Sequence, residues 1–284
     1  MKIRHLIQKV NELPTLPGVL LEIESILKNE STDIEKVSSL IERDQSLTTN
    51  LLRFANSPYY GLSYHVDTVK KAVVVLGLNS LWHFLVRASV FTFMSKSESI
   101  SFDAQGLWRH SLSSAVATKA LVGKTNQALQ ENAFICGLIH DIGKVAIARY
   151  LPREMQKVLE RIRNSHMATE SEIENEVLGF THAHVGALLG KKWRLPKEYV
   201  EITQLHHAPQ YGSHAIHPHH MLLRYSVYAA NQIVKALSLG RSTDEKAKTI
   251  ASDTWRILGI TKEDFPEIIY EIKSNFDRIA TTWS

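Results

Sequence analysis

Apolar residues recur along most of the chain at the three- and four-residue spacing that is typical of amphipathic helices. Leu20, Ile23, Ile26 and Leu27 form one such stripe, and similar stripes continue to residue 279. The sequence shows no convincing alternation of apolar and polar residues, the pattern that would indicate strands. We therefore predict an all-α fold, in the form of a multi-helix bundle.

Glycine and polar stretches divide the predicted helices from one another. Gly77 is expected to end a helix that begins near Thr68, ahead of a second apolar helix from Leu81 to Met94. The polar stretch over residues 95–101 is the best candidate for a domain boundary. We therefore expect an N-terminal helical half over residues 1–98 and a second half, with C-terminal helices, over residues 99–284.

Composition narrows the classes of function. Hydrophobic residues make up 44% and charged residues 22% of the 284, which is ordinary for a globular protein. The net charge of +4 comes from scattered residues, so it favours solvated faces over a nucleic-acid track, and a nucleic-acid partner is not expected. The single cysteine, Cys136, excludes an intrachain disulfide framework and fits a reducing cytoplasm. We expect a cytoplasmic protein without a signal peptide or membrane partner.

One apolar segment, Ala133 to Ile147, carries His140, Asp141 and Lys144 at its centre. Burying a polar group unsatisfied costs roughly 2–7 kcal/mol, so these side chains must be hydrogen-bonded, paired or metal-bound. Histidine and aspartate are ligands of hard or borderline divalent cations. On a continuous helix His140 and Lys144 would share a face, and Lys144 would reach an anion held on a metal.

Further histidines lie in or at the ends of predicted helices, with apolar neighbours at helical spacing. They are His110, His184, His206 and His207. Long gaps between them exclude a zinc-finger arrangement and fit a site built between packed helices. Hydrogen-bonded core histidines are the alternative on spacing alone. Helix geometry also leaves open which of His206 and His207 faces inward, because neighbours on a helix point about 100° apart.

Several short segments together resemble a known family. Residues 108–111 (WRHS) and 137–144 (GLIHDIGK) resemble the HD superfamily of metal-dependent phosphohydrolases. Residues 10–235 more closely resemble the HD-related output domain, written HDOD. The other matching segments are LPTLP (13–17), LLRFANS (51–57), VVVLGL (73–78), HVGA (184–187), WRLP (193–196) and HHAP (206–209). The resemblance implies a helical N-terminal half packed on an HD-like half, and a role in bacterial signal transduction.

The resemblance also implies a metal site. His110, His140 and Asp141 would hold one divalent ion, with Asp141 able to bridge to a second. The last ligand of the superfamily is an aspartate, and Asn231 stands at the matching position. Asparagine offers a neutral carbonyl in place of a charge, so it should weaken a hard-cation site. The implied ion is Fe, Mn, Ni, Zn or Mg.

His184 and either His206 or His207 resemble the second-metal ligands of the HD-GYP phosphodiesterases. The Gly-Tyr-Pro segment expected after the histidine pair is absent, because APQYGSHAIHPHH follows His207. This departure argues against hydrolysis of cyclic dinucleotides.

Two hypotheses for function follow. The first is a signalling module that keeps an HD-type metal site and acts by protein–protein contact. The alternative is a metal-dependent phosphohydrolase that uses a metal-activated water, with Asp141 and Lys144 as catalytic residues and Lys144 neutralising phosphate charge. The expected partners are a signalling protein and a small phosphorylated ligand.

Overall fold

The computed structural model describes residues 18–27, 33–57, 62–95, 102–165, 167–211, 217–244 and 246–280. Every regular element in these ranges is an α-helix or a short 3-10 helix. The predicted all-α class is therefore confirmed. The matching segment at residues 13–17 and residues 96–101 of the expected boundary lie outside the described residues.

The chain forms two compact units, residues 15–92 and residues 93–284. In the described part of the first unit there are four helices, of which the last continues a few residues beyond it. They are α2 (Gly18–Leu27), α3 (Ile34–Glu42), α4 (Gln45–Ala55) and α5 (Val69–Ser95). The boundary that we expect between residues 98 and 99 stays a prediction.

The core of the first unit forms where α4 and α5 face each other. The rings of Phe54 and Phe84 lie 5.1 Å apart between centroids, and both side chains are buried. Gly77 has φ 72° and ψ 162°, a conformation that glycine adopts without strain, so α5 is broken there as the sequence predicts. By length and composition alone, α5 is the one described helix that could cross a membrane. Buried core helices share this length and composition.

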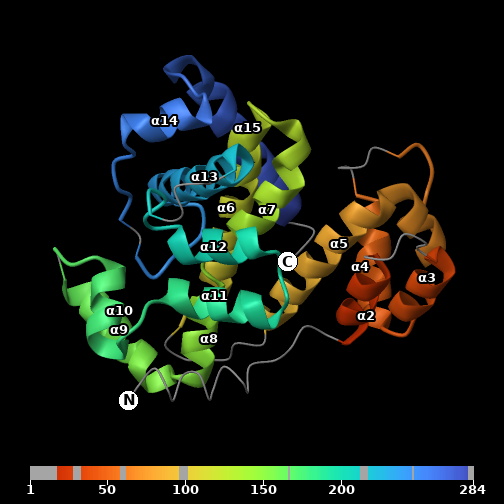
Figure 1. Cartoon of the computed structure of the whole chain (residues 1–284), viewed down its shortest axis with the longest axis horizontal. Helices are drawn as coiled ribbons and strands as arrows, with labels where there is room; N and C mark the ends of the chain where they lie inside the picture. Colours follow the sequence, from red (N-terminus) through yellow and green to blue (C-terminus); the bar gives the residue numbers. More distant parts are fainter. Residues whose placement is uncertain are drawn as a thin grey trace. The chain divides into compact units, whose positions relative to one another are not determined.

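The second unit is organised around α6 (Ala104–Gly123), which packs against α7 (Gln130–Ile139), α13 (Pro218–Ala236) and α15 (Phe265–Ala280) (Figure 1). Buried alanines on α6 and α13, among them Ala117 and Ala230, let these helices approach closely. The short helix α14 (Ser252–Leu258) packs on α13.

A second layer of this unit consists of α8 (Ile142–Tyr150), α11 (His182–Lys192) and α12 (Lys197–Leu205), with α11 between the other two (Figure 1). A Cβ atom on Gly143 would lie 2.0 Å from the carbonyl oxygen of His182. Any side chain at Gly143 would therefore push α8 away from α11. The remaining pair, α9 (Pro152–Asn164) and α10 (Glu170–Leu178), packs beside α8.

Residues 133–147 do not form one continuous helix. Helix α7 ends at Ile139 and α8 begins at Ile142, so His140 and Asp141 form the junction. The Nδ1 atom of the buried His140 ring lies 2.7 Å from the carbonyl oxygen of Gly137. In a continuous helix that oxygen would accept from the backbone N–H of Asp141, so the ring contact replaces a helical hydrogen bond.

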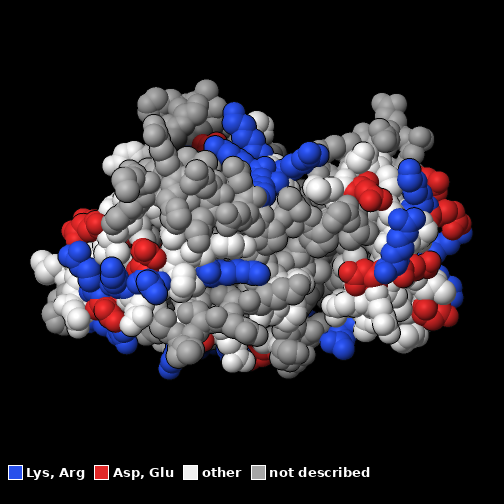
Figure 2. All heavy atoms as spheres, turned by 90° about the horizontal axis from the view of Figure 1, so that it is seen from below, with Lys and Arg blue, Asp and Glu red and all other residues white. Residues whose placement is uncertain are grey.

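Surface charges of both signs lie close together on the face that Figure 2 displays. Ion pairs join exposed side chains in both units, for example Lys71 with Asp67 and Arg161 with Glu176. This intermixing is typical of solvated protein surfaces.

Candidate metal centre

The packing of α6 against α7 brings His110 and His140 together. His110 lies on α6 and His140 follows the last residue of α7, which packs along α6. Their rings lie 5.4 Å apart between centroids, and both side chains are almost fully buried.

Asp141 lies at the centre of the cluster. Its Oδ2 atom is 3.4 Å from His140 Nε2 and 3.6 Å from His110 Nε2. Its Oδ1 atom is 3.3 Å from His182 Nε2 and 3.5 Å from His206 Nε2. Four imidazoles therefore surround one carboxylate that is 0% exposed.

The C-terminal end of α12 supplies two histidines to this cluster. His206 Nε2 lies 3.3 Å, and His207 Nε2 2.9 Å, from the Nε2 atom of His182. These three rings form one group with the spacing of metal ligands, and His110, His140 and Asp141 form another. Both His206 and His207 therefore face the cluster, which answers the question that helix geometry leaves open.

Backbone carbonyl groups orient two of the rings. His140 Nδ1 lies 2.7 Å from the Gly137 oxygen, and His206 Nδ1 lies 2.7 Å from the Thr203 oxygen. A carbonyl oxygen only accepts, so Nδ1 must be the donor in each ring. In the neutral imidazole this leaves an unprotonated Nε2 whose lone pair points toward Asp141.

A carboxylate orients the third ring. His182 Nδ1 lies 2.8 Å from the Oε2 atom of Glu174, which is itself fully buried on α10. A carboxylate that holds the far nitrogen of a histidine is the usual support of a metal-ligating imidazole.

The donor atoms of this cluster are arranged in a way that suits a cation between them. Within the described part of the chain, neither His110 Nε2 nor His140 Nε2 has a hydrogen-bond partner, although both are buried near a carboxylate. Acceptors that face one another without a cation or proton between them would repel. A divalent metal ion fits a set of imidazole nitrogens and one carboxylate.

Burial and neighbouring charge set the protonation of these groups. Burial lowers the pKa of His110 and His207 well below its usual range and lowers the pKa of His206 to about 4. Burial opposes the charge on Asp141, but His140 and Lys144 outweigh it and hold the pKa of the carboxyl well below its usual range. At neutral pH these groups are therefore in their metal-binding forms.

His182 differs from the other rings because Glu174 is beside it. Burial disfavours its charged form, yet the negative charge of Glu174 raises the pKa of His182 to about 10. Without a metal ion, this ring therefore carries a second proton at Nε2. Metal binding at that nitrogen would release the proton.

Lys144 occupies a different environment from the one that we predict from the sequence. Its Nζ atom donates to Asp141 Oδ2 at 2.9 Å, to Glu170 Oε2 at 3.0 Å and to Ser242 Oγ at 2.9 Å. An ammonium group has three donors, so all of them are used within the protein. The side chain is 1% exposed. Lys144 is thus placed to hold Asp141, and its role toward a phosphate group stays a prediction.

His184, which the resemblance places among the metal ligands, does not lie in the cluster, and His182 lies there instead. His184 is exposed and lies at the third position of α11, where its Nδ1 atom accepts from the backbone N–H of Thr181, the residue that caps the helix. Side chains at this position commonly turn back to the cap. The threonine three residues before His184 is the sequence signal for this role. The carboxylates of Glu170 and Glu174 also lie close to His182. The sequence contains no comparable signal for their place at the site.

Asn231 is buried on α13, and its side-chain oxygen has no hydrogen-bond partner among the described residues. A buried, unsatisfied carbonyl oxygen is costly, so its environment suits a bound group. Its assignment to the metal site stays a prediction.

The two histidines of α11 allow a matched test. We expect His182→Gln to lower metal affinity by about 10- to 100-fold, because it removes a donor that Glu174 orients. We expect His184→Gln to leave metal affinity unchanged, because glutamine also suits the capping position. Metal titration of both purified variants measures the difference. Equal losses would contradict the placement of His182.

The fold and the cluster define an all-α protein with a buried His/Asp cluster that could hold a metal. Residues 13–209 match the HDOD domain, which is most of the chain, and the chain therefore belongs to the HDOD family.

Curated proteins match part of this chain in sequence. An uncharacterized protein of Treponema pallidum (strain Nichols) is 26% identical over 200 residues, which are 70% of this chain and 38% of the relative. The chain spans about a third of the length of the curated relatives that it matches.

Solved structures share the fold over nearly the whole chain. An HDOD domain protein of unknown function from Geobacter sulfurreducens has a TM-score of 0.78 and 24% identity, with 99% of this chain and 96% of that chain covered. A candidate phosphohydrolase from Shewanella amazonensis SB2B has a TM-score of 0.74 and 24% identity, covering 98% of each chain. A protein from Marinobacter aquaeolei VT8, named for signal transduction, has a TM-score of 0.75 and 20% identity, covering 96% and 59%.

Proposed function

We propose that this chain is a bacterial signal-transduction module that binds a divalent metal ion in the His/Asp cluster and acts on a signalling partner by protein–protein contact. The observation that carries the metal-binding part is the convergence of imidazole Nε2 atoms on the buried carboxylate of Asp141. The signalling part is supported by membership of the HDOD family and by the name of the Marinobacter relative.

Different residues of the chain would bind the metal ion and position its ligands. His110, His140 and Asp141, together with the group His182, His206 and His207, would hold the metal. Glu174 holds His182 in position, and Lys144 holds Asp141 through a direct hydrogen bond. A bound metal ion supplies positive charge that lowers the pKa of a coordinated water.

Two observations favour a module without efficient catalysis. Asn231 stands where the superfamily has an aspartate, so the site offers one negative charge less. The three N–H donors of Lys144 all form hydrogen bonds within the protein. The ammonium group is therefore not available to neutralise developing charge on a phosphate.

The second candidate function is a metal-dependent phosphohydrolase with Asp141 as a metal-binding catalytic residue. The Shewanella structure, named as a candidate phosphohydrolase, shares the fold. The specific observation in its favour is a surface pocket lined by His110, which would give a phosphate compound access to the cluster.

One experiment separates the two functions. Purified protein without a tag is analysed for bound metal and then assayed with Mn²⁺, Fe²⁺ and Mg²⁺ on cyclic and linear phosphodiesters. We expect bound metal in the wild type, loss of metal in His140→Ala and no metal-dependent turnover in either protein. Turnover that disappears in His140→Ala would establish the phosphohydrolase, and a wild type that binds no divalent metal would remove both functions.

A further inference from the structure

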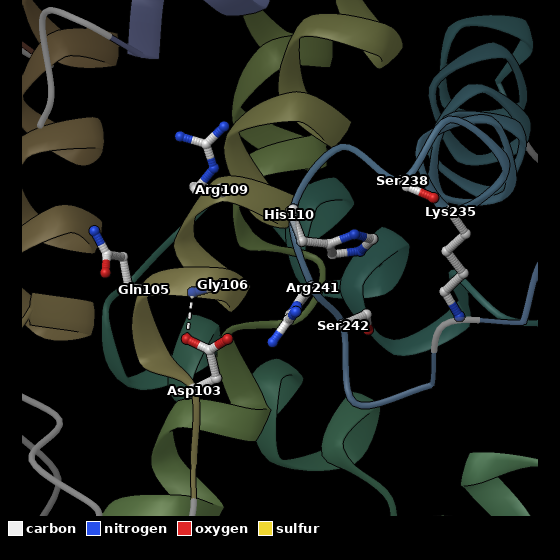
Figure 3. A pocket seen from close by; sticks show the side chains of 10 residues that line it. Asp103, Gln105, Gly106, Arg109, His110, Lys235, Ser238, Arg241 and Ser242 are labelled. Atoms are coloured by element: carbon white, nitrogen blue, oxygen red, sulfur yellow. Dashed lines mark hydrogen bonds between the residues drawn. The ribbon is translucent and has the colours of Figure 1, made fainter.

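The second unit has a surface pocket of about 590 Å³ between the N-terminal end of α6 and the loop that follows α13 (Figure 3). Gln105 and Arg109 line it from α6, and Ser238 and Arg241 line it from the loop. Its volume falls in the range of small-molecule sites.

Cations outnumber anions in the lining of this pocket. Arg109, Lys235 and Arg241 contribute positive charge, whereas Asp103 contributes the one carboxylate of the described lining. Asp103 is also committed to capping α6, because its Oδ1 atom accepts from the N–H of Gly106 at 2.7 Å (Figure 3). The pocket therefore favours a negatively charged ligand.

Lys235 is the strongest sign that a ligand is recognised here. Its side chain is 4% exposed, and among the described residues its one partner is the carboxylate of Asp244, with which it forms a long ion pair of 3.5 Å that leaves two of its three donors unused. Lys144, in contrast, makes three short hydrogen bonds. A buried ammonium group with donors to spare is costly unless an anion approaches it.

The inner end of the pocket reaches the His/Asp cluster. Figure 3 shows the His110 ring extending from α6 toward the side on which Lys235 lies. His110 is 1% exposed, and its Nε2 atom has no hydrogen-bond partner in the described ranges. An unpartnered buried nitrogen and an under-satisfied ammonium group thus share one cavity.

The loop that forms the outer wall also contacts the centre directly. Arg241 donates its backbone N–H to the carbonyl oxygen of Gly106 at 2.9 Å, which fixes the loop to α6. The next residue, Ser242, accepts from Lys144 Nζ at 2.9 Å and lies 3.4 Å from Asp141 Oδ2. A ligand bound by Arg241 would therefore contact the immediate chain neighbour of Ser242, which takes part in the hydrogen bonds around Asp141.

We propose that this pocket binds a small phosphate compound carrying at least two negative charges, with Arg109, Lys235 and Arg241 as its charged contacts. Guanidinium groups match phosphate oxygens in geometry, and lysine adds a compact charge. The ligand is the input of the module, and in this respect the inference rests on the proposed signalling function. The bound compound acts on the metal centre through Ser242 and His110.

The test uses inorganic pyrophosphate as the probe and the 284-residue chain from which metal has been stripped. We expect saturable one-to-one binding in titration calorimetry that weakens as salt is added, because the contacts are ionic. Arg241→Ala and Arg109→Ala should each weaken binding at least tenfold. The control is Arg153→Ala, which removes an exposed arginine of α9 that does not line the pocket, and it should leave binding unchanged.

The outcomes separate this inference from the proposed function. Absence of saturable binding, or equal binding by wild type and both pocket variants, overturns the pocket even if metal binding is intact. Binding that requires added metal and is lost in His140→Ala but kept in Arg241→Ala places the anion on the metal and also overturns it. Arg241 is exposed, so its variant should fold, and circular dichroism checks this.

Discussion

Replacing Asp141 by asparagine is expected to lower the affinity for divalent metal by more than about 100-fold, the upper end of what loss of a supporting group costs. The carboxylate lies between the imidazoles of His110 and His140 on one side and of His182 and His206 on the other. Removing its charge therefore weakens both groups of donors at once. Metal content after purification and titration of the stripped protein measure the effect.

The matched control for this variant is Asp277→Asn. Asp277 is exposed on α15, far along the chain from the cluster residues, and the same chemical change there should leave metal content unaltered. Wild-type affinity in Asp141→Asn would show that the ion binds elsewhere or that the carboxylate contributes nothing to it.

Replacing Lys144 by methionine is expected to lower the free energy of unfolding by about 3–5 kcal/mol, the usual cost of removing one partner from a buried ion pair. Asp141 and Glu170 would both lose a short hydrogen bond to an ammonium group in a site without solvent. Urea unfolding at pH 7 of metal-stripped protein measures the change. Added Glu170→Gln should restore part of the lost stability, because it removes one of the two unpaired charges.

The same ion pair predicts the direction of acid unfolding. Burial disfavours the charge on Glu170, but Lys144 outweighs it and lowers the pKa of the carboxyl from 4.5 to about 2. A depressed pKa adds stability that is present above pH 4.5 and is lost as the pH falls toward about 2. Glu170→Gln should reduce the slope of stability against pH in this window.

A loss of only about 0–1 kcal/mol in Lys144→Met, as in an exposed pair, would contradict the buried network.

Much of the fold follows from local patterns in the sequence. Apolar spacing predicts the all-α class, and Gly77 marks the break in α5, because both signals depend on residues close in the chain. The junction at His140 and Asp141 could not be predicted in this way. It depends on a hydrogen bond from the His140 ring, and that ring is held by its burial against residues far away in sequence.

In the candidate site too, local spacing predicts some of the residues and misses others. His110, His140, Asp141, His206 and His207 could be chosen because each lies among apolar residues at helical spacing, and the structure brings them together. His182 could not be separated from His184 by that criterion, since both lie on α11. What separates them is the cap at Thr181 and the approach of Glu174 from α10. The pocket beside His110 depends on a loop that helical patterns do not describe.

The cluster draws its donors from residue 110 through residue 207, on helices that must all be docked before the nitrogens meet. Its assembly therefore comes late in folding, after loops of considerable length have closed. An ion that binds only the finished cluster would stabilise it by mass action, about 2.7 kcal/mol at one hundred times its dissociation constant. The supply of metal would then shift the equilibrium between the folded and the unfolded chain.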